Sequence, residues 1–148
     1  MIMDLLIDTF DTHEVEARVI VIRSLTYIVD CIARSGMNFQ YTIQKIQNVL
    51  ARGLNDYTIN EQGDIGSLVR LEALNALIKV WELEIDIDST DTIVSHWTVH
   101  RLALEKLDRV RVQAAQCLKF RVSTFIARSV TPHLLCIDRI LIHIVLTT

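Results

Sequence analysis

The stretch Val69–Leu77, VRLEALNAL, decides the fold because it returns later in the chain as Val110–Leu118, VRVQAAQCL. The two stretches align without a gap at an offset of 41 residues (110 − 69 = 41). Both begin with Val-Arg and then place alanine and leucine at helical spacing, so their apolar residues share one face of an α-helix. Each stretch therefore predicts a helix that buries this face against a partner helix.

A weaker third copy lies upstream at Ala17–Leu25, where an arginine again follows the first residue. It precedes the first copy by 52 residues (69 − 17 = 52), and the polar stretch 55–63 accounts for the extra length. A period of about 40 to 47 residues is typical of HEAT and armadillo proteins, in which antiparallel helix pairs stack into an α-solenoid. We therefore expect residues 1–148 to be an all-α fragment of a HEAT/armadillo-like solenoid, with about three repeats.

The composition favours long helices, because 51% of the residues are hydrophobic and the chain has only four glycines and one proline. The spacing of apolar residues predicts helices over 14–34, 39–52, 64–83 and 93–120. The last of these is expected in two pieces, with a break that the pattern does not locate. Asp11 and Glu14 have capping-box spacing at the start of the first helix. Residues 121–148 are expected to form a divergent apolar tail.

Charge and cysteine usage exclude several classes of protein. The net charge of −3 gives no general attraction to nucleic acid. The apolar C-terminal stretch is interrupted by Asp138 and Arg139, and it is too short for a membrane span. The three cysteines form no CxxC pair, which favours reduced thiols in the cytosol, and the acidic N-terminal residues are unlike a secretory signal. We therefore expect a cytoplasmic protein that binds no nucleic acid and has no membrane span.

Two acid–arginine pairs share one spacing. Asp64 lies six residues before Arg70 (70 − 64 = 6), and Glu105 lies six before Arg111 (111 − 105 = 6). The sequence around Asp64, GDIG, lacks the lysine of a phosphate-binding loop and the alternating acids of a calcium-binding loop. We therefore interpret Asp64 as the cap of the following helix, and the four residues as a structural ladder of ion pairs between adjacent repeats.

A metal site is the alternative from another functional class. His96 and His100 are spaced i, i+4 on an expected helix, which is a geometry that can bind zinc. However, Trp97 stands where a zinc protease motif has its glutamate, and no third ligand is evident. We expect no catalytic residue, no metal and no cofactor, and we keep a small helical metalloenzyme as a less favoured hypothesis.

Two longer strings carry a family resemblance: LARGLNDYTINEQGDIGSLVRLEALNAL (50–77) and EKLDRVRVQAA (105–115). Together they resemble the C-terminal HEAT region of the tubulin-folding cofactor D family. The resemblance implies a cytosolic, microtubule-associated chaperone that captures β-tubulin. It also implies that the chaperone assembles and disassembles αβ-tubulin together with other tubulin-folding cofactors and an Arf-like small GTPase, and that it has no catalytic residues. After about Leu118 the sequence departs from the family pattern.

The polar stretch that begins near Asn55 is not explained by the repeat, although it carries most of the resemblance. We therefore expect a partner-contact loop at Asp56, Tyr57 and Thr58. The alternative among binding modules is a generic HEAT-repeat adaptor whose partner is unrelated to tubulin.

Overall fold

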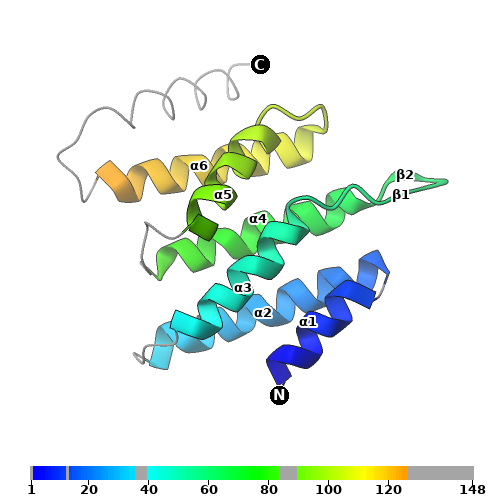
Figure 1. Ribbon diagram of the computed structural model, residues 1–148. Helices are drawn as coiled ribbons and strands as arrows, with labels where there is room; N and C mark the ends of the chain where they lie inside the picture. Colours follow the sequence, from blue (N-terminus) through cyan, green and yellow to red (C-terminus); the bar gives the residue numbers. More distant parts are fainter. Residues whose placement is uncertain (1, 13, 36–39, 84–89, 127–148) are drawn as a thin grey trace.

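The chain folds into consecutive helix pairs in the computed structural model, which describes residues 2–12, 14–35, 40–83 and 90–126 (Figure 1). The expected all-α class is confirmed. The pairs are α1 (Ile2–Thr12) with α2 (Val15–Ser35), α3 (Gln40–Gly53) with α4 (Gly66–Glu82), and α5 (Thr90–Leu102) with α6 (Asp108–Ile126). A small antiparallel hairpin of β1 (Ile59–Asn60) and β2 (Gly63–Asp64) lies inside the second pair.

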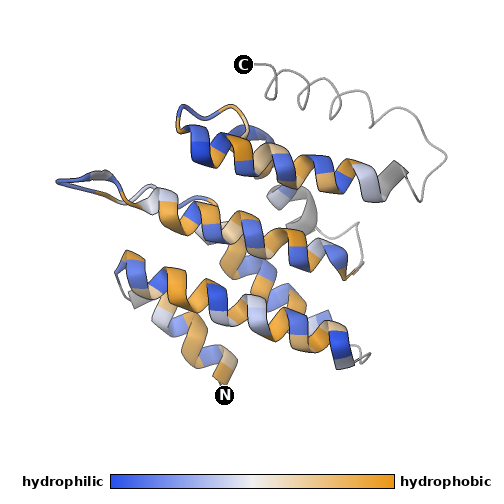
Figure 2. Cartoon of the chain, turned by 180° about the vertical axis from the view of Figure 1, so that it is seen from behind, coloured by the Kyte–Doolittle hydropathy of each residue, from blue (hydrophilic) through white to orange (hydrophobic). Residues whose placement is uncertain are grey.

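The helices form two layers. The second helices of the pairs lie side by side, with α2 against α4 and α4 against α6, while α3 contacts α5 in the other layer. Figure 1 shows α1, α3 and α5 in front, and Figure 2 shows the layer of α2, α4 and α6 from the opposite side. The turns inside the pairs meet at one edge of the stack, from which the hairpin projects (Figure 1).

The core lies between the two layers and is built from the repeated apolar positions. All the apolar positions of the pattern are buried in the two strong copies, whereas in the weaker copy the first position, Ala17, is only partly buried and the other three are buried. The buried residues are Val21, Ile22, Leu25, Val69, Ala73, Leu74, Leu77, Val110, Ala114, Ala115 and Leu118. Burial of one large aliphatic side chain contributes about 1.5–3 kcal/mol. The small residues in α4 and α6 let these helices pack closely, and the contact extends to the Cys117 thiol, whose sulfur lies 4.0 Å from the Leu74 carbonyl oxygen.

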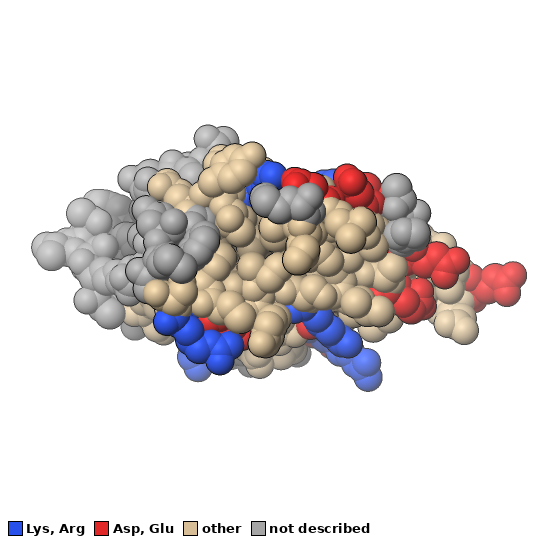
Figure 3. Space-filling model, turned by 90° about the horizontal axis from the view of Figure 1, so that it is seen from below, with Lys and Arg blue, Asp and Glu red and all other residues tan. Residues whose placement is uncertain are grey.

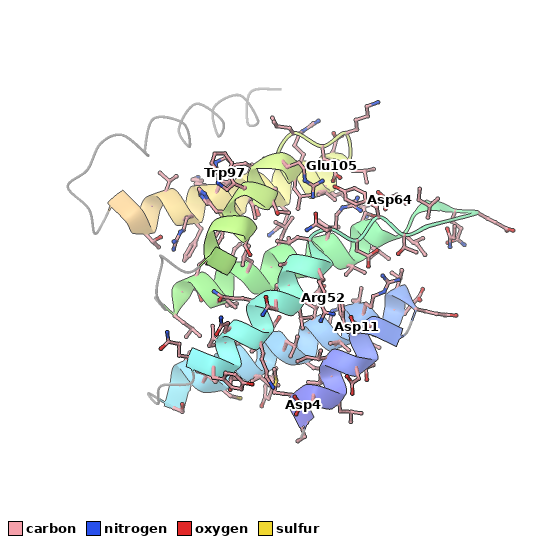
Figure 4. The ribbon with its side chains drawn as sticks, in the orientation of Figure 1. Asp4, Asp11, Arg52, Asp64, Trp97 and Glu105 are labelled. Carbon is pink, nitrogen blue, oxygen red and sulfur yellow. The ribbon has the colours of Figure 1, made fainter. Side chains whose placement is uncertain are left out.

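The first helix was not expected from the sequence. Met3, Leu6, Ile7 and Phe10 have helical spacing, and α1 uses this face to pack against α2. Asp11 consequently lies inside α1 and forms an ion pair with Arg52 of α3, so it does not cap α2 as its spacing suggested (Figure 4). A second ion pair, with 2.9 Å between Asp4 Oδ1 and Lys45 Nζ, also joins α1 to α3. The hydrogen bond to Lys45 lowers the pKa of Asp4.

The other helices begin and end close to the expected residues, with two differences. The expected segment 93–120 is broken by the turn 103–107, which contains neither glycine nor proline and therefore gives no local signal for a break. Helix α6 then continues to Ile126, so residues 121–126 belong to a helix and not to a separate tail. The rest of the expected tail, 127–148, lies outside the described residues.

Charge is unevenly spread over the surface of the first pair. Figure 3 shows a broad area without charged side chains, and acidic side chains gather at the end from which the hairpin projects. Among the described helices, none is both long and apolar enough to cross a membrane.

Candidate functional site

Arg70 of α4 is the centre of the candidate site, and its side chain is completely buried. Its Nη2 lies 2.6 Å from Asp64 Oδ2, and its Nε lies 3.5 Å from Glu105 Oε2. Its Nη1 also donates a hydrogen bond to the backbone carbonyl of Asp56. A buried guanidinium is stable only where its charge and donors are compensated, and here the compensation comes from the turns of two different pairs.

Arg18 of α2 occupies the corresponding position in the first copy of the repeat, and it contacts the same loop. Its Nη1 lies 2.5 Å from Asp56 Oδ2, and its Nη2 donates to the Thr58 hydroxyl at 3.1 Å. The Asp56 side chain is only 3% exposed. Its other oxygen accepts hydrogen bonds from the Thr58 backbone N–H at 3.0 Å and from the Thr58 hydroxyl at 2.7 Å. The carboxylate is therefore held from both sides.

Asp56 and Glu105 occupy equivalent places in their pairs. Asp56 lies three residues after the end of α3 at Gly53, and Glu105 lies three after the end of α5 at Leu102. Each acid is reached by the arginine of the preceding pair, Arg18 or Arg70. We call these two contacts, Arg18–Asp56 and Arg70–Glu105, the arginine ladder, because they join the first pair to the second and the second to the third.

The predicted ladder residues are placed differently from the expectation. Asp64 does contact Arg70, but both residues belong to the second pair, so this ion pair does not join two repeats. Glu105 and Arg111 are not brought together, although they share the same spacing. Arg111 instead pairs with Asp108 at 2.7 Å, one turn away on the same helix, while Glu105 faces the buried Arg70.

Asp64 also lies one residue away from its expected capping position. The N-cap residue of α4 is Ile65, which makes no side-chain cap bond. Asp64 precedes it and accepts a hydrogen bond from the Ser67 backbone N–H at 3.1 Å, while the Ser67 hydroxyl donates to the Asp64 carbonyl at 2.7 Å. The carboxylate therefore still satisfies one free donor at the positive end of the helix.

The hairpin is locked onto α4 by a close backbone approach at Gly66. The Gly66 N–H donates to the Thr58 carbonyl at 2.9 Å. A Cβ atom on Gly66 would lie 2.5 Å from the Asp56 carbonyl oxygen and 2.6 Å from the Thr58 nitrogen, so no larger residue fits there without a shift of the backbone. At the tip, Gly63 has a φ of 108°, a conformation that favours glycine. The base of the hairpin is therefore fixed against the start of α4.

Tyr57 lies between two arginines at the base of the hairpin. The Arg70 guanidinium carbon is 4.2 Å from the ring centre and that of Arg101 is 5.4 Å away. Arg101 also donates to the Tyr57 hydroxyl and, at 2.8 Å, to the Asn55 side-chain oxygen. Burial, followed by the hydrogen bond to Glu105, raises the pKa of Tyr57. Tyr57 thus links the hairpin to the turn of the third pair.

The predicted partner-contact residues are therefore mostly engaged within the molecule. Asp56 and Thr58 face the arginine ladder, and only Tyr57 keeps a substantial exposed surface. The part of the loop that projects is the hairpin itself, where Ile59 is 74% exposed and Glu61 and Gln62 lie at the tip. The role of Asp56 in the ladder was missed because its position relative to the end of α3 is not visible in the repeat spacing.

His96 and His100 lie together on α5, with ring centres 4.4 Å apart. The His100 ring nitrogen Nδ1 lies 2.9 Å from the His96 carbonyl oxygen, and Trp97 lies beside it with its ring centre 5.8 Å away (Figure 4). Within the described ranges, no group of three histidine, cysteine, aspartate or glutamate residues is arranged to hold a metal ion. The two histidines thus gain no third ligand from the part of the chain that the structure describes.

Comparison with known protein families, curated proteins and solved structures finds no match to this chain.

Proposed function

We propose that the chain is a segment of a HEAT-type α-solenoid that works as a protein-binding scaffold without an active site. The observation that supports this most strongly is the arginine ladder. In a solenoid each repeat packs on its neighbours through the same positions, and Arg18–Asp56 and Arg70–Glu105 use equivalent positions in successive pairs. The stacking of α2, α4 and α6 in chain order is also what such a scaffold requires.

The partner that we propose is tubulin. This rests on the resemblance to the tubulin-folding cofactor D family, whose most specific residues lie in and around the hairpin. The hairpin is suited to contact a partner because it projects from the stack and is held rigidly at Gly66 and Tyr57. In this proposal the segment takes part in β-tubulin capture and in αβ-tubulin assembly and disassembly, with other tubulin-folding cofactors and under regulation by an Arf-like small GTPase in the cytoplasm.

Binding of the purified chain to αβ-tubulin tests this proposal directly. We expect immobilised chain to retain αβ-tubulin, and the Arf-like GTPase to be retained or to change the amount of tubulin bound. The variant Ile59→Ser should weaken retention, whereas the matched variant Ile20→Ser should not, because both isoleucines are exposed but only Ile59 lies on the hairpin. If neither tubulin nor the GTPase is retained, the tubulin assignment falls and the generic HEAT adaptor remains.

The metalloenzyme hypothesis has a separate test. Elemental analysis of the purified chain should find no stoichiometric zinc. A stoichiometric metal that is lost in the His96→Ala variant would support an enzyme and contradict a scaffold without an active site.

A further inference from the structure

The turn between α5 and α6 carries three cations that form no ion pair with any carboxylate in the described part of the chain. Residues 101–109, which we call the cationic turn, contain the exposed cations Arg101, Lys106 and Arg109. The chain as a whole has a net charge of −3, and on the face seen in Figure 3 acidic side chains lie at the end from which the hairpin projects.

Both acids of the cationic turn are already paired with arginines outside it. Glu105 faces Arg70, and Asp108 is paired with Arg111. Among the described residues, no carboxylate lies within ion-pair distance of Arg101, Lys106 or Arg109. Arg101 is hydrogen-bonded, but its partners are the uncharged side chains of Tyr57 and Asn55. The three positive charges are therefore available to an external anion.

Two leucines lie exposed among these cations. Leu104 is 63% exposed and Leu107 is 40% exposed. The residue equivalent to Leu104 in the preceding pair, two positions after the end of the first helix, is the polar Asn55. Exposed apolar side chains within a polar rim are typical of protein interaction sites. The combination of leucines and cations matches a partner surface that carries both carboxylates and apolar side chains.

We propose that the cationic turn docks an acidic, leucine-containing segment of a partner protein. Its carboxylates pair with Arg101, Lys106 and Arg109, and its apolar side chains cover Leu104 and Leu107. This inference rests on the scaffold role proposed above and names the chemistry of one partner contact. Nucleic acid is a poorer match, because binding to it relies on many phosphate contacts and uses no exposed leucines.

Fluorescence anisotropy with the full chain tests the proposal. The probe is a labelled synthetic peptide that alternates glutamate and leucine, compared with a glutamate-only peptide and a lysine–leucine peptide of equal length. We expect the glutamate–leucine peptide to bind, the glutamate-only peptide to bind more weakly, and the lysine–leucine peptide not to bind. Binding should weaken at high salt, because exposed ion pairs are screened.

Matched variants locate the site. Lys106→Glu should weaken peptide binding about fivefold, in the range expected when an exposed attraction becomes a repulsion. Lys119→Glu makes the same charge change at another exposed lysine of α6 and should leave binding unchanged. Leu104→Ser should also weaken binding about threefold, whereas Leu5→Ser, at a leucine that is 67% exposed on α1, should not.

Three results would overturn the inference: no binding of the glutamate–leucine peptide, equal effects of Lys106→Glu and Lys119→Glu, or tighter binding of a short DNA duplex or of phosphatidylserine vesicles. The proposed function is tested separately. If the peptide binds but tubulin does not, the cationic turn stands and the tubulin assignment falls. If tubulin binds equally well to wild type and to Lys106→Glu, the cationic turn is not the contact and the scaffold role stands.

Discussion

The turn inside the second pair and the turn inside the third pair both present a carboxylate to the arginine of the preceding pair, but the turn of the second pair is longer. Both place an acid three residues after the first helix, Asp56 in one and Glu105 in the other. The longer connection, residues 54–65, wraps around its acid, so Asp56 is buried and bonded to Arg18 and Thr58. The short turn 103–107 supplies Glu105 with an ion pair of 3.5 Å to Arg70. The longer connection thus gives Asp56 more hydrogen-bond partners than the short turn gives Glu105.

The largest effect is expected at the arginine that both turns share. Arg70→Ala removes the buried donor to Asp64 and to the Asp56 carbonyl and also removes the positive charge that faces Glu105, so it should lower the free energy of unfolding by about 3 kcal/mol. Urea unfolding followed by circular dichroism measures this change. A loss below about 1 kcal/mol would show that Arg70 does not hold the two turns together.

The next largest effect tests the backbone lock that only the longer turn has. Gly66→Ala should cost about 2 kcal/mol, because the added methyl group meets the Asp56 carbonyl and the Thr58 nitrogen. Gly63→Ala is the matched control, since it has free space around it and a cost of only about 1 kcal/mol from its positive φ. Equal costs in thermal unfolding would contradict the close approach at Gly66.

A direct comparison of the two acids should reproduce the difference between the turns. Asp56→Asn removes a buried charge from Arg18 and should lower stability by about 1.5 kcal/mol. Glu105→Gln should cost about 0.5 kcal/mol, because its contact with Arg70 is longer and Arg70 keeps Asp64. The two variants can be ranked by chemical denaturation under identical conditions. A larger loss for Glu105→Gln would reverse our assignment of the stronger rung.

Arg111 should contribute little, because its ion pair with Asp108 is local and that carboxylate is 79% exposed. We expect Arg111→Ala to change the unfolding free energy by about 0.5 kcal/mol. The same denaturation experiment serves as the measurement. A cost equal to that of Arg70→Ala would mean that Arg111 also forms a rung.

The smallest effect concerns the titration of Tyr57. Because its pKa is raised in the folded protein, the folded state keeps the phenol proton that the unfolded chain releases above about pH 10. The titration of Tyr57 therefore leaves the free energy of unfolding unchanged near neutral pH and lowers it as the pH rises above about 10. Ultraviolet titration should show a tyrosine ionisation phase at raised pH that Tyr57→Phe removes. If the late phase persists in Tyr57→Phe, it belongs to another tyrosine.

Much of the fold was predictable because helix periodicity is local. The Val-Arg-x-x-Ala pattern identified α4 and α6, and its weaker copy identified α2, since each buries the face that the pattern marks. Helix α1 was missed because its apolar face covers only a few turns near the N-terminus. The break at 103–107 was not located because no glycine or proline marks it.

The candidate site was less predictable, because ion-pair partners depend on distances between elements. Asp64 and Arg70 do meet as their spacing suggested, since both belong to one pair. The same spacing wrongly predicted an ion pair between Glu105 and Arg111, because Glu105 instead forms an ion pair with the buried Arg70 of the preceding pair. In the arginine ladder, Arg18 and Asp56 lie 38 positions apart, whereas Arg70 and Glu105 lie 35 apart (105 − 70 = 35), because the connecting segments differ in length. Such contacts become visible only when the pairs are stacked.

The position of the arginine ladder also has a mechanical consequence. Its two rungs lie along the edge where the turns of successive pairs meet, so stretching that edge breaks ion pairs, whereas pivoting one pair on the next about that edge preserves them. The stack should therefore bend with this edge as its hinge. A partner bound near the hairpin lies close to the hinge, where bending displaces the surface least.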